Sequence, residues 1–152
     1  MDPLSIAATS CSIAAVCGTL LSYVSKFVTD TAQVPQTLEE FKTSITTLSM
    51  VLSNIDHVLS SRPKQLPFAQ EEERKHWKDV RNVLEACNGC LYRLKNELPE
   101  LPDNHKILAQ TRAQLDLNLK SNVIIQIRRH ISSYTQILQL SLTTMTLLVL
   151  TT

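Results

Sequence analysis

The sequence is short of the residues on which many enzymes and nucleic-acid-binding proteins depend. Its 152 residues include only two glycines, Gly18 and Gly89, and neither lies in a glycine-rich loop of the kind that holds phosphate. One tryptophan, three tyrosines and three phenylalanines are too few for a platform on which bases stack. The formal net charge of +1 gives no electrostatic reason to expect nucleic acid or an acidic substrate as a partner.

Catalytic groupings are also missing from the sequence. Neither a triad nor a carboxylate dyad is visible around the four histidines, which are His57, His76, His105 and His130. Cys87 and Cys90 form a C-x-x-C pattern, but it lies within a helical stretch rather than where a strand meets a helix, and zinc would need further ligands. We therefore expect no enzymatic activity, no cofactor and no metal. A redox or metal enzyme is the weakest alternative, and we interpret both cysteines as small core residues.

Charge is absent from one long stretch, between Asp2 and Lys26. As a helix, the residues from Leu4 to Ser25 would be about 33 Å long, close to the ~30 Å hydrocarbon thickness of a bilayer. Asp2 and Pro3 suit the start of a helix. Seven of these 22 residues are Ser or Thr, which argues against a permanent membrane span. The lack of Lys or Arg before the stretch argues against a secretory signal, and four cysteines without such a signal are typical of a reducing compartment.

This first helix suits two environments, the core of a helical bundle and a membrane. Its weakly polar stripe consists of Ser5, Thr9, Ser12, Thr19 and Ser22. The side chains that we predict to be membrane-active are Leu4, Ile6, Ile13, Cys17, Leu20, Leu21, Val24 and Phe27. We interpret the segment as a core helix at rest that enters a membrane when it is released.

Three more long helices are predicted by apolar positions that alternate at spacings of three and four, the heptad pattern of packed helices. In the range 36–61 these positions are Leu38, Phe41, Ile45, Leu48, Leu52, Ile55 and Leu59, with Met50, Val51 and Val58 widening the apolar face. In the range 69–98 they are Trp77, Val80, Leu84, Cys87, Leu91, Leu94 and Leu98. In the range 121–148 they are Ile124, Ile127, Ile131, Tyr134, Leu138, Leu142 and Met145.

With a first helix over residues 3–30, the pattern predicts an all-α, up-and-down four-helix bundle that forms a single domain over residues 1–152. The range 103–117 is uncertain and could form one extra short helix, and the stretch from Leu117 to Asn122 is either a hinge or part of a continuous helix. The uncharged, apolar end from Thr143 to Thr152 leads us to expect that the domain is the N-terminal part of a longer receptor, or that this end packs on a partner.

Three segments carry a resemblance to a known group. They are Met1-Asp2-Pro3-Leu4-Ser5-Ile6-Ala7-Ala8, the stretch from Gln114 to Ser121, and the stretch from Ile127 to Leu142. Together they resemble the fungal HeLo-like N-terminal domains of NOD-like receptors (STAND proteins). These domains are similar in architecture to the four-helix domain of the necroptosis pseudokinase and to the coiled-coil domains of plant resistance proteins. The predicted first helix, from Leu4 to Val24, contains no ring of acidic residues, so the likeness does not extend to an ion-conducting funnel.

The resemblance implies a domain that oligomerises on activation and releases its N-terminal helix, residues 4–24, toward the plasma membrane to execute cell death. The implied partners are other copies of the chain, the rest of the receptor or an adaptor, and anionic lipid; nucleic acid is not among them. Lys26, Lys120, Arg128 and Arg129 are candidates for contact with lipid headgroups, or form a plain exposed face. We expect the protein to be cytoplasmic at rest and at the plasma membrane when active. The alternative function is a non-lethal module for oligomerisation or adaptor docking.

Overall fold

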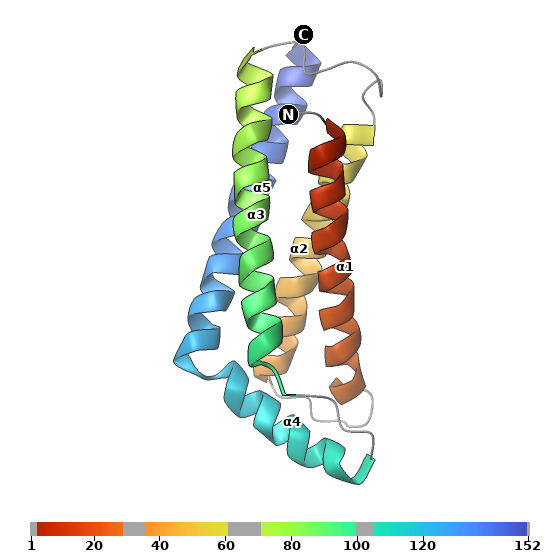
Figure 1. Cartoon of the computed structure of the whole chain (residues 1–152), viewed down its shortest axis with the longest axis vertical. Coiled ribbons are helices and arrows are strands. Elements are labelled where there is room, and N and C mark those ends of the chain that lie inside the picture. Colours follow the sequence, from red (N-terminus) through yellow and green to blue (C-terminus); the bar gives the residue numbers. More distant parts are fainter. Residues whose placement is uncertain (1–2, 29–35, 61–70, 100–104, 152) are drawn as a thin grey trace.

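In the part of the chain that the structure describes, four long helices lie side by side, and one shorter helix lies across one end of them (Figure 1). The computed structural model describes residues 3–28, 36–60, 71–99 and 105–151. In order, the helices are α1 (Pro3–Val28), α2 (Gln36–Ser60), α3 (Glu71–Glu97), α4 (His105–Leu119) and α5 (Asn122–Thr151). Within those ranges there is no strand. The prediction of an all-α up-and-down four-helix bundle with an extra short helix is confirmed.

The observed helix ends differ slightly from the predicted ones. The third helix stops at Glu97, because Pro99 has no N–H with which to continue it. The last helix runs on to Thr151, since no glycine or proline interrupts it. The predicted residues 29–30, 61, 69–70 and 103–104 lie outside the described residues.

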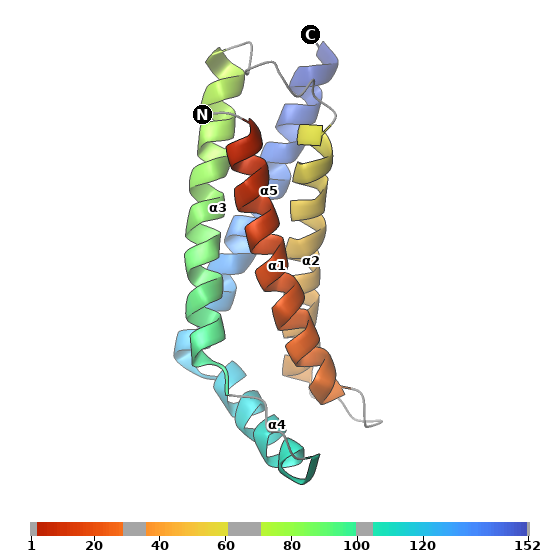
Figure 2. The same cartoon turned by 45° about the vertical axis from the view of Figure 1, so that its right-hand side comes forward.

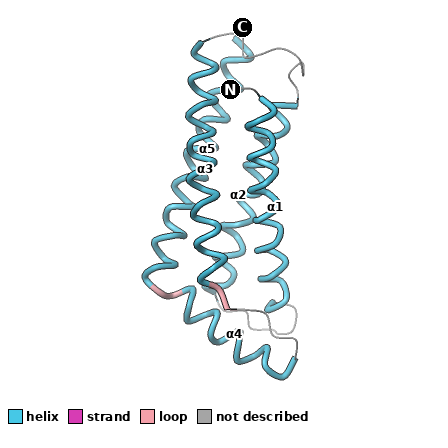
Figure 3. The backbone as a smooth tube through the Cα atoms, in the orientation of Figure 1, coloured by secondary structure: helices cyan, strands magenta, loops and turns pink. Residues whose placement is uncertain are grey.

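The uncertain range before the last helix contains both of the features considered for it, a short helix and a hinge. α4 extends to Leu119, and a turn at Lys120 and Ser121 separates it from α5 (Figure 3). The Lys120 N–H donates to the Leu117 carbonyl at 3.2 Å, which closes the last turn of α4. The Ser121 hydroxyl then accepts a hydrogen bond from the Ile124 N–H at 3.4 Å, in the manner of a helix N-cap.

The order of the helices around the bundle places α1 and α3 next to each other. α1 packs on α2 and α3, and α5 packs on the same two helices from the other side, so α1 and α5 lie diagonally opposite (Figures 1 and 2). α1 and α3 run in one direction, and α2 and α5 run back. The C-terminal ends of α1 and α3 therefore meet at the end of the bundle where α4 lies.

The heptad seams form the core largely as predicted. All seven seam residues of α2 are buried, as are six of the seven on α3, whereas Leu98 is partly buried. On α5, Tyr134 and Leu142 are partly buried, and Thr135 is buried with its hydroxyl donating to the Ile131 carbonyl at 2.7 Å. The prediction for Met50 is wrong: its side chain is 63% exposed, because it points away from both neighbouring helices, while Val51 is buried and Val58 partly buried.

Both glycines lie on exposed faces in the middle of helices, where a Cβ would meet no atom within 4 Å. Gly18→Ala and Gly89→Ala should therefore each stabilise the fold by about 0.5–1 kcal/mol, because alanine loses less backbone entropy in a helix. Urea denaturation of each variant measures this. Ala15→Gly, on the same exposed face as Gly18, is the matched reversal and should destabilise by a similar amount; a loss of stability in either alanine variant would contradict the open surroundings described here.

Candidate membrane-active helix

The inner face of α1 forms one wall of the core. Its buried positions are Ile6, Ser10, Ile13, Cys17, Leu20, Val24 and Phe27, an unbroken alternation of four and three residues. Six of the eight residues predicted to be membrane-active belong to this seam, and none of these six is more than 2% exposed. Leu21 is partly buried beside the seam, and the side chain of Leu4 lies outside the described residues.

Ser10 is the seam residue that sequence reasoning missed. It is 1% exposed, and its hydroxyl donates to the Leu52 carbonyl of α2 at 3.4 Å. The spacing between Ile6 and Ile13 calls for a core residue at position 10, and only the polar side chain concealed it. A buried hydroxyl needs a partner, and here the partner belongs to the neighbouring helix.

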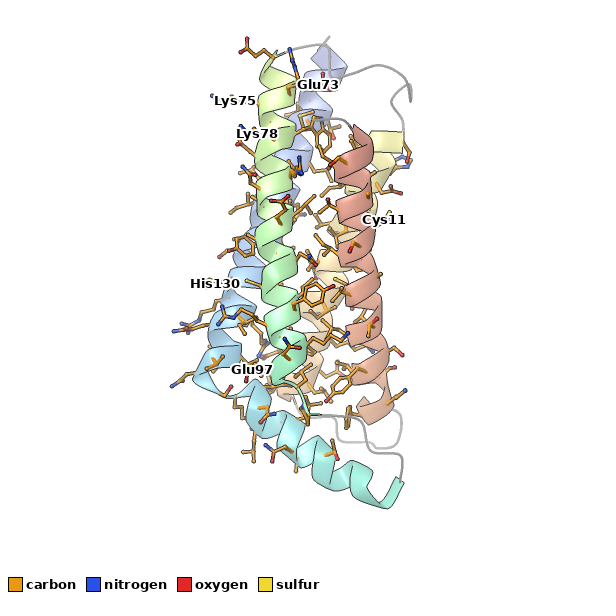
Figure 4. The ribbon with its side chains drawn as sticks, in the orientation of Figure 1. Cys11, Glu73, Lys75, Lys78, Glu97 and His130 are labelled. Atoms are coloured by element: carbon orange, nitrogen blue, oxygen red, sulfur yellow. The ribbon has the colours of Figure 1, made fainter. Side chains whose placement is uncertain are left out.

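The outer face of α1 is built from small side chains. The exposed positions Ala8, Cys11, Ala15, Gly18, Ser22 and Ser25 follow one another at spacings of three and four. Figure 4 places Cys11 on the outer side of this helix. A shallow groove farther along is lined by Ala15, Gly18, Thr19, Ser22, Tyr23 and Lys26. The six exposed positions of this face, from Ala8 to Ser25, carry neither a charge nor a bulky side chain.

Three hydroxyl groups on α1, those of Thr9, Thr19 and Ser25, donate to carbonyls of the same helix. Thr9 donates to the Ser5 carbonyl at 3.0 Å, and Thr19 to the Ala15 carbonyl at 3.1 Å. Such bonds lower the cost of moving a hydroxyl out of water, because the group keeps its partner in any medium. These three of the seven Ser and Thr residues from Leu4 to Ser25 are thus a weaker obstacle to lipid than their polarity suggests, whereas Ser10 would lose its partner on α2.

α1 is also the helix, among the described residues, whose length and composition suit a membrane crossing. The span runs from Ser5 to Phe27, 23 residues, and 28% of its most apolar window is buried in the bundle. A core helix of a soluble protein passes the same test, so the span is compatible with both environments that the sequence suggests.

The four basic residues proposed for lipid headgroups share one end of the bundle but do not form one surface. Lys26 is exposed at the end of α1, and Arg129 is exposed on α5, diagonally across the bundle. Lys120 is exposed and forms an ion pair with Asp116 at 3.0 Å. Arg128 is only 19% exposed and approaches Glu40 of α2 at 3.8 Å, so it joins two helices rather than facing solvent.

Two side-chain hydrogen bonds join three helices at the same end. The Tyr23 hydroxyl of α1 donates to the carbonyl of Pro99, just beyond α3, and its ring lies 5.1 Å from that of Phe27. The Asn118 amide of α4 donates to the Glu97 carbonyl at 3.2 Å. Burial raises the pKa of Tyr23 to about 12, so the phenol keeps its proton and remains a donor at physiological pH.

The C-x-x-C pair lies beside a third cysteine that the sequence did not associate with it. Cys17, Cys87 and Cys90 are buried, and Cys11 is exposed. Burial raises the pKa of Cys17 to about 11 and that of Cys87 to about 12; for Cys87, the nearby Cys17 and Cys90 thiols add to the effect. A thiol with a raised pKa is a poor nucleophile at neutral pH. Among the described residues there is also no group of ligands fit to hold a metal.

Comparisons with protein-family models, with curated proteins and with solved structures find no match to this chain.

The thiols provide a test of this packing. We expect Cys11 to react readily with a thiol reagent in the folded protein, and Cys17 and Cys87 to react only when α1 and α3 separate. Because their folded pKa values are raised, these two thiols should favour the native state below about pH 9, and that contribution should be lost as the pH rises toward 11 and 12.

Mass spectrometry after timed labelling identifies the modified residues. A Cys11→Ser variant, which lacks the exposed thiol, should take up almost no label until denaturant is added. Rapid labelling of Cys17 in native buffer at neutral pH would contradict the buried position of the α1 seam.

Proposed function

We propose that this chain is an N-terminal signalling and effector domain of the kind carried by fungal NOD-like receptors. It oligomerises, targets membranes through α1, and thereby executes regulated cell death. The observation that carries the proposal is the double character of α1: the six apolar side chains of its seam are buried in the bundle, while the exposed positions of its outer face, from Ala8 to Ser25, are uncharged and small. The family likeness of the three sequence segments supports the same function.

The free energy of burying its apolar side chains holds α1 in the resting bundle. α1 can leave the bundle at low cost only if a second apolar environment receives these side chains. Fully burying one aliphatic or aromatic side chain contributes roughly 1.5–3 kcal/mol, so the six apolar seam residues contribute on the order of 10 kcal/mol. Release into water would forfeit this contribution. Release into hydrocarbon would retain most of it, because the same side chains remain out of water. The protein would thus be cytoplasmic at rest and at the plasma membrane when active.

Partners follow from the same mechanism. Copies of the chain would associate on activation, the rest of the receptor or an adaptor would hold the resting state, and anionic lipid would receive α1. Lys26, Lys120 and Arg129 are exposed and can meet anionic headgroups, whereas Arg128 would first have to give up its contact with Glu40.

The exposed side of α5 favours a second candidate, a non-lethal oligomerisation or adaptor-docking module. Ile137, Leu140 and Leu147 are 45%, 70% and 58% exposed, and no Asp, Glu, Lys or Arg follows Arg129 in the sequence. An apolar, uncharged surface of this kind suits another protein as well as a membrane.

The outer face of α1 allows the two candidates to be separated without damage to the fold. Ala15→Glu and Thr19→Glu place a carboxylate where the bundle meets solvent, so thermal stability should hardly change. A charge at the centre of a bilayer costs roughly 2.5–3.5 kcal/mol. Each variant should therefore reduce leakage of anionic liposomes by about a hundredfold at equal protein concentration.

Thr47→Glu, at an exposed position of α2, is the matched control and should leak liposomes as the original chain does. If the α1 variants cause full leakage, α1 does not enter the bilayer. If the original chain neither binds nor permeabilises liposomes, whether monomeric or assembled, the docking module becomes the better description.

A further inference from the structure

The α1–α3 interface is closed at one end by a hydrogen bond from a side chain to the backbone. α1 packs more extensively on α2 than on α3, so the contact with α3 is the weaker of its two interfaces. α1 and α3 run in the same direction, which brings Tyr23, near the end of α1, beside Pro99, just after α3. The Tyr23 hydroxyl donates to the Pro99 carbonyl across this interface.

The acceptor is held in place by the way in which α3 ends. The last carbonyls of a helix have no partners within it and must find them elsewhere. The Leu98 N–H turns back to the Lys95 carbonyl at 3.4 Å, and the Asn118 amide of α4 takes the Glu97 carbonyl at 3.2 Å. The Tyr23 hydroxyl donates to the carbonyl of Pro99, two residues beyond the end of α3, so side chains of α1 and α4 both bond to the backbone where α3 ends.

We propose that the hydrogen bond from Tyr23 to Pro99 is a latch that holds the C-terminal half of α1 against α3, and that the release of α1 begins with its opening. The biological role of this latch rests on the proposed function, but the experiment that tests the latch does not depend on that function. The phenol ring also packs on Phe27 at 5.1 Å, so the latch orders the last turns of α1 from both the polar and the apolar side.

Two native thiols report on the state of the latch. Cys17 lies six residues before Tyr23, about 9 Å along the helix. It is buried in the core beside Cys87 of α3. When the C-terminal half of α1 moves away from α3, both thiols meet solvent, and they can then be alkylated by a maleimide. Their labelling rates therefore measure how often this interface opens.

The test removes a single oxygen atom. Tyr23→Phe, in a Cys11→Ser chain, keeps the ring on Phe27 but loses the donor, and labelling is followed without lipid. A typical intramolecular hydrogen bond contributes enough to stability that its loss should raise the labelling rates of Cys17 and Cys87 by about two- to tenfold. Hydrogen exchange should accelerate in α1 and stay unchanged in α5.

Tyr134→Phe supplies the matched control, since it makes the same chemical change in a partly buried tyrosine of α5. It should leave both labelling rates unchanged. Equal rates in the Tyr23→Phe chain and its parent would overturn the latch, as would an equal acceleration of exchange in α1 and α5, which would indicate general destabilisation.

The outcome is independent of membrane activity. Faster labelling in a chain that never permeabilises liposomes would leave the latch standing and remove the proposed function. Unchanged labelling in a chain that does permeabilise liposomes would remove the latch and leave the proposed function standing.

Discussion

The structure depends on one set of side chains that can be buried in only one place at a time. The seam of α1 from Ile6 to Phe27 completes the core that α2, α3 and α5 leave open, and it is also the most apolar surface that this helix has to offer to lipid. While α1 is packed in the core, the apolar side chains of its seam cannot contact a membrane. Entry of α1 into a membrane would therefore be coupled to an opening of the bundle, and the stability of the resting fold would set the barrier to that step.

The arrangement of the helices determines where such an opening would start. Because α1 and α3 are parallel neighbours, their C-terminal ends lie together, and α4 crosses the bundle there. Tyr23, Asn118 and the carbonyls at the end of α3 connect three helices within a small region. At the other contact of α1, the buried Ser10 bonds to the backbone of α2. These hydrogen bonds join α1 to both neighbouring helices. The bond at the end of α3 is made by Tyr23, which also lines the shallow groove on the outer side of α1.

Much of this fold follows from sequence periodicity, and the candidate site follows from it only in part. The seven-residue seam of α2 is buried throughout, since heptad spacing and apolar type agree at every position. The sequence did not decide whether the range of α4 is helical, because its apolar residues follow no clear period. Ser10 was overlooked because its residue type conflicts with its position. The meeting of Cys17 with Cys87, and of Tyr23 with Pro99, depends on which helices are neighbours and in which direction they run, and no local pattern encodes that.

The most direct test of the account asks how deep α1 lies in a membrane. Cys11 is exposed, so a small fluorophore can be attached there while the buried thiols stay unmodified. The labelled protein is then bound to anionic liposomes that carry a quencher either at the headgroup or deep in the acyl chain. If α1 leaves the bundle and enters the bilayer, the deep quencher should be the more effective of the two. Membrane binding with quenching from the headgroup alone would contradict the account, because α1 would then have remained outside the hydrocarbon.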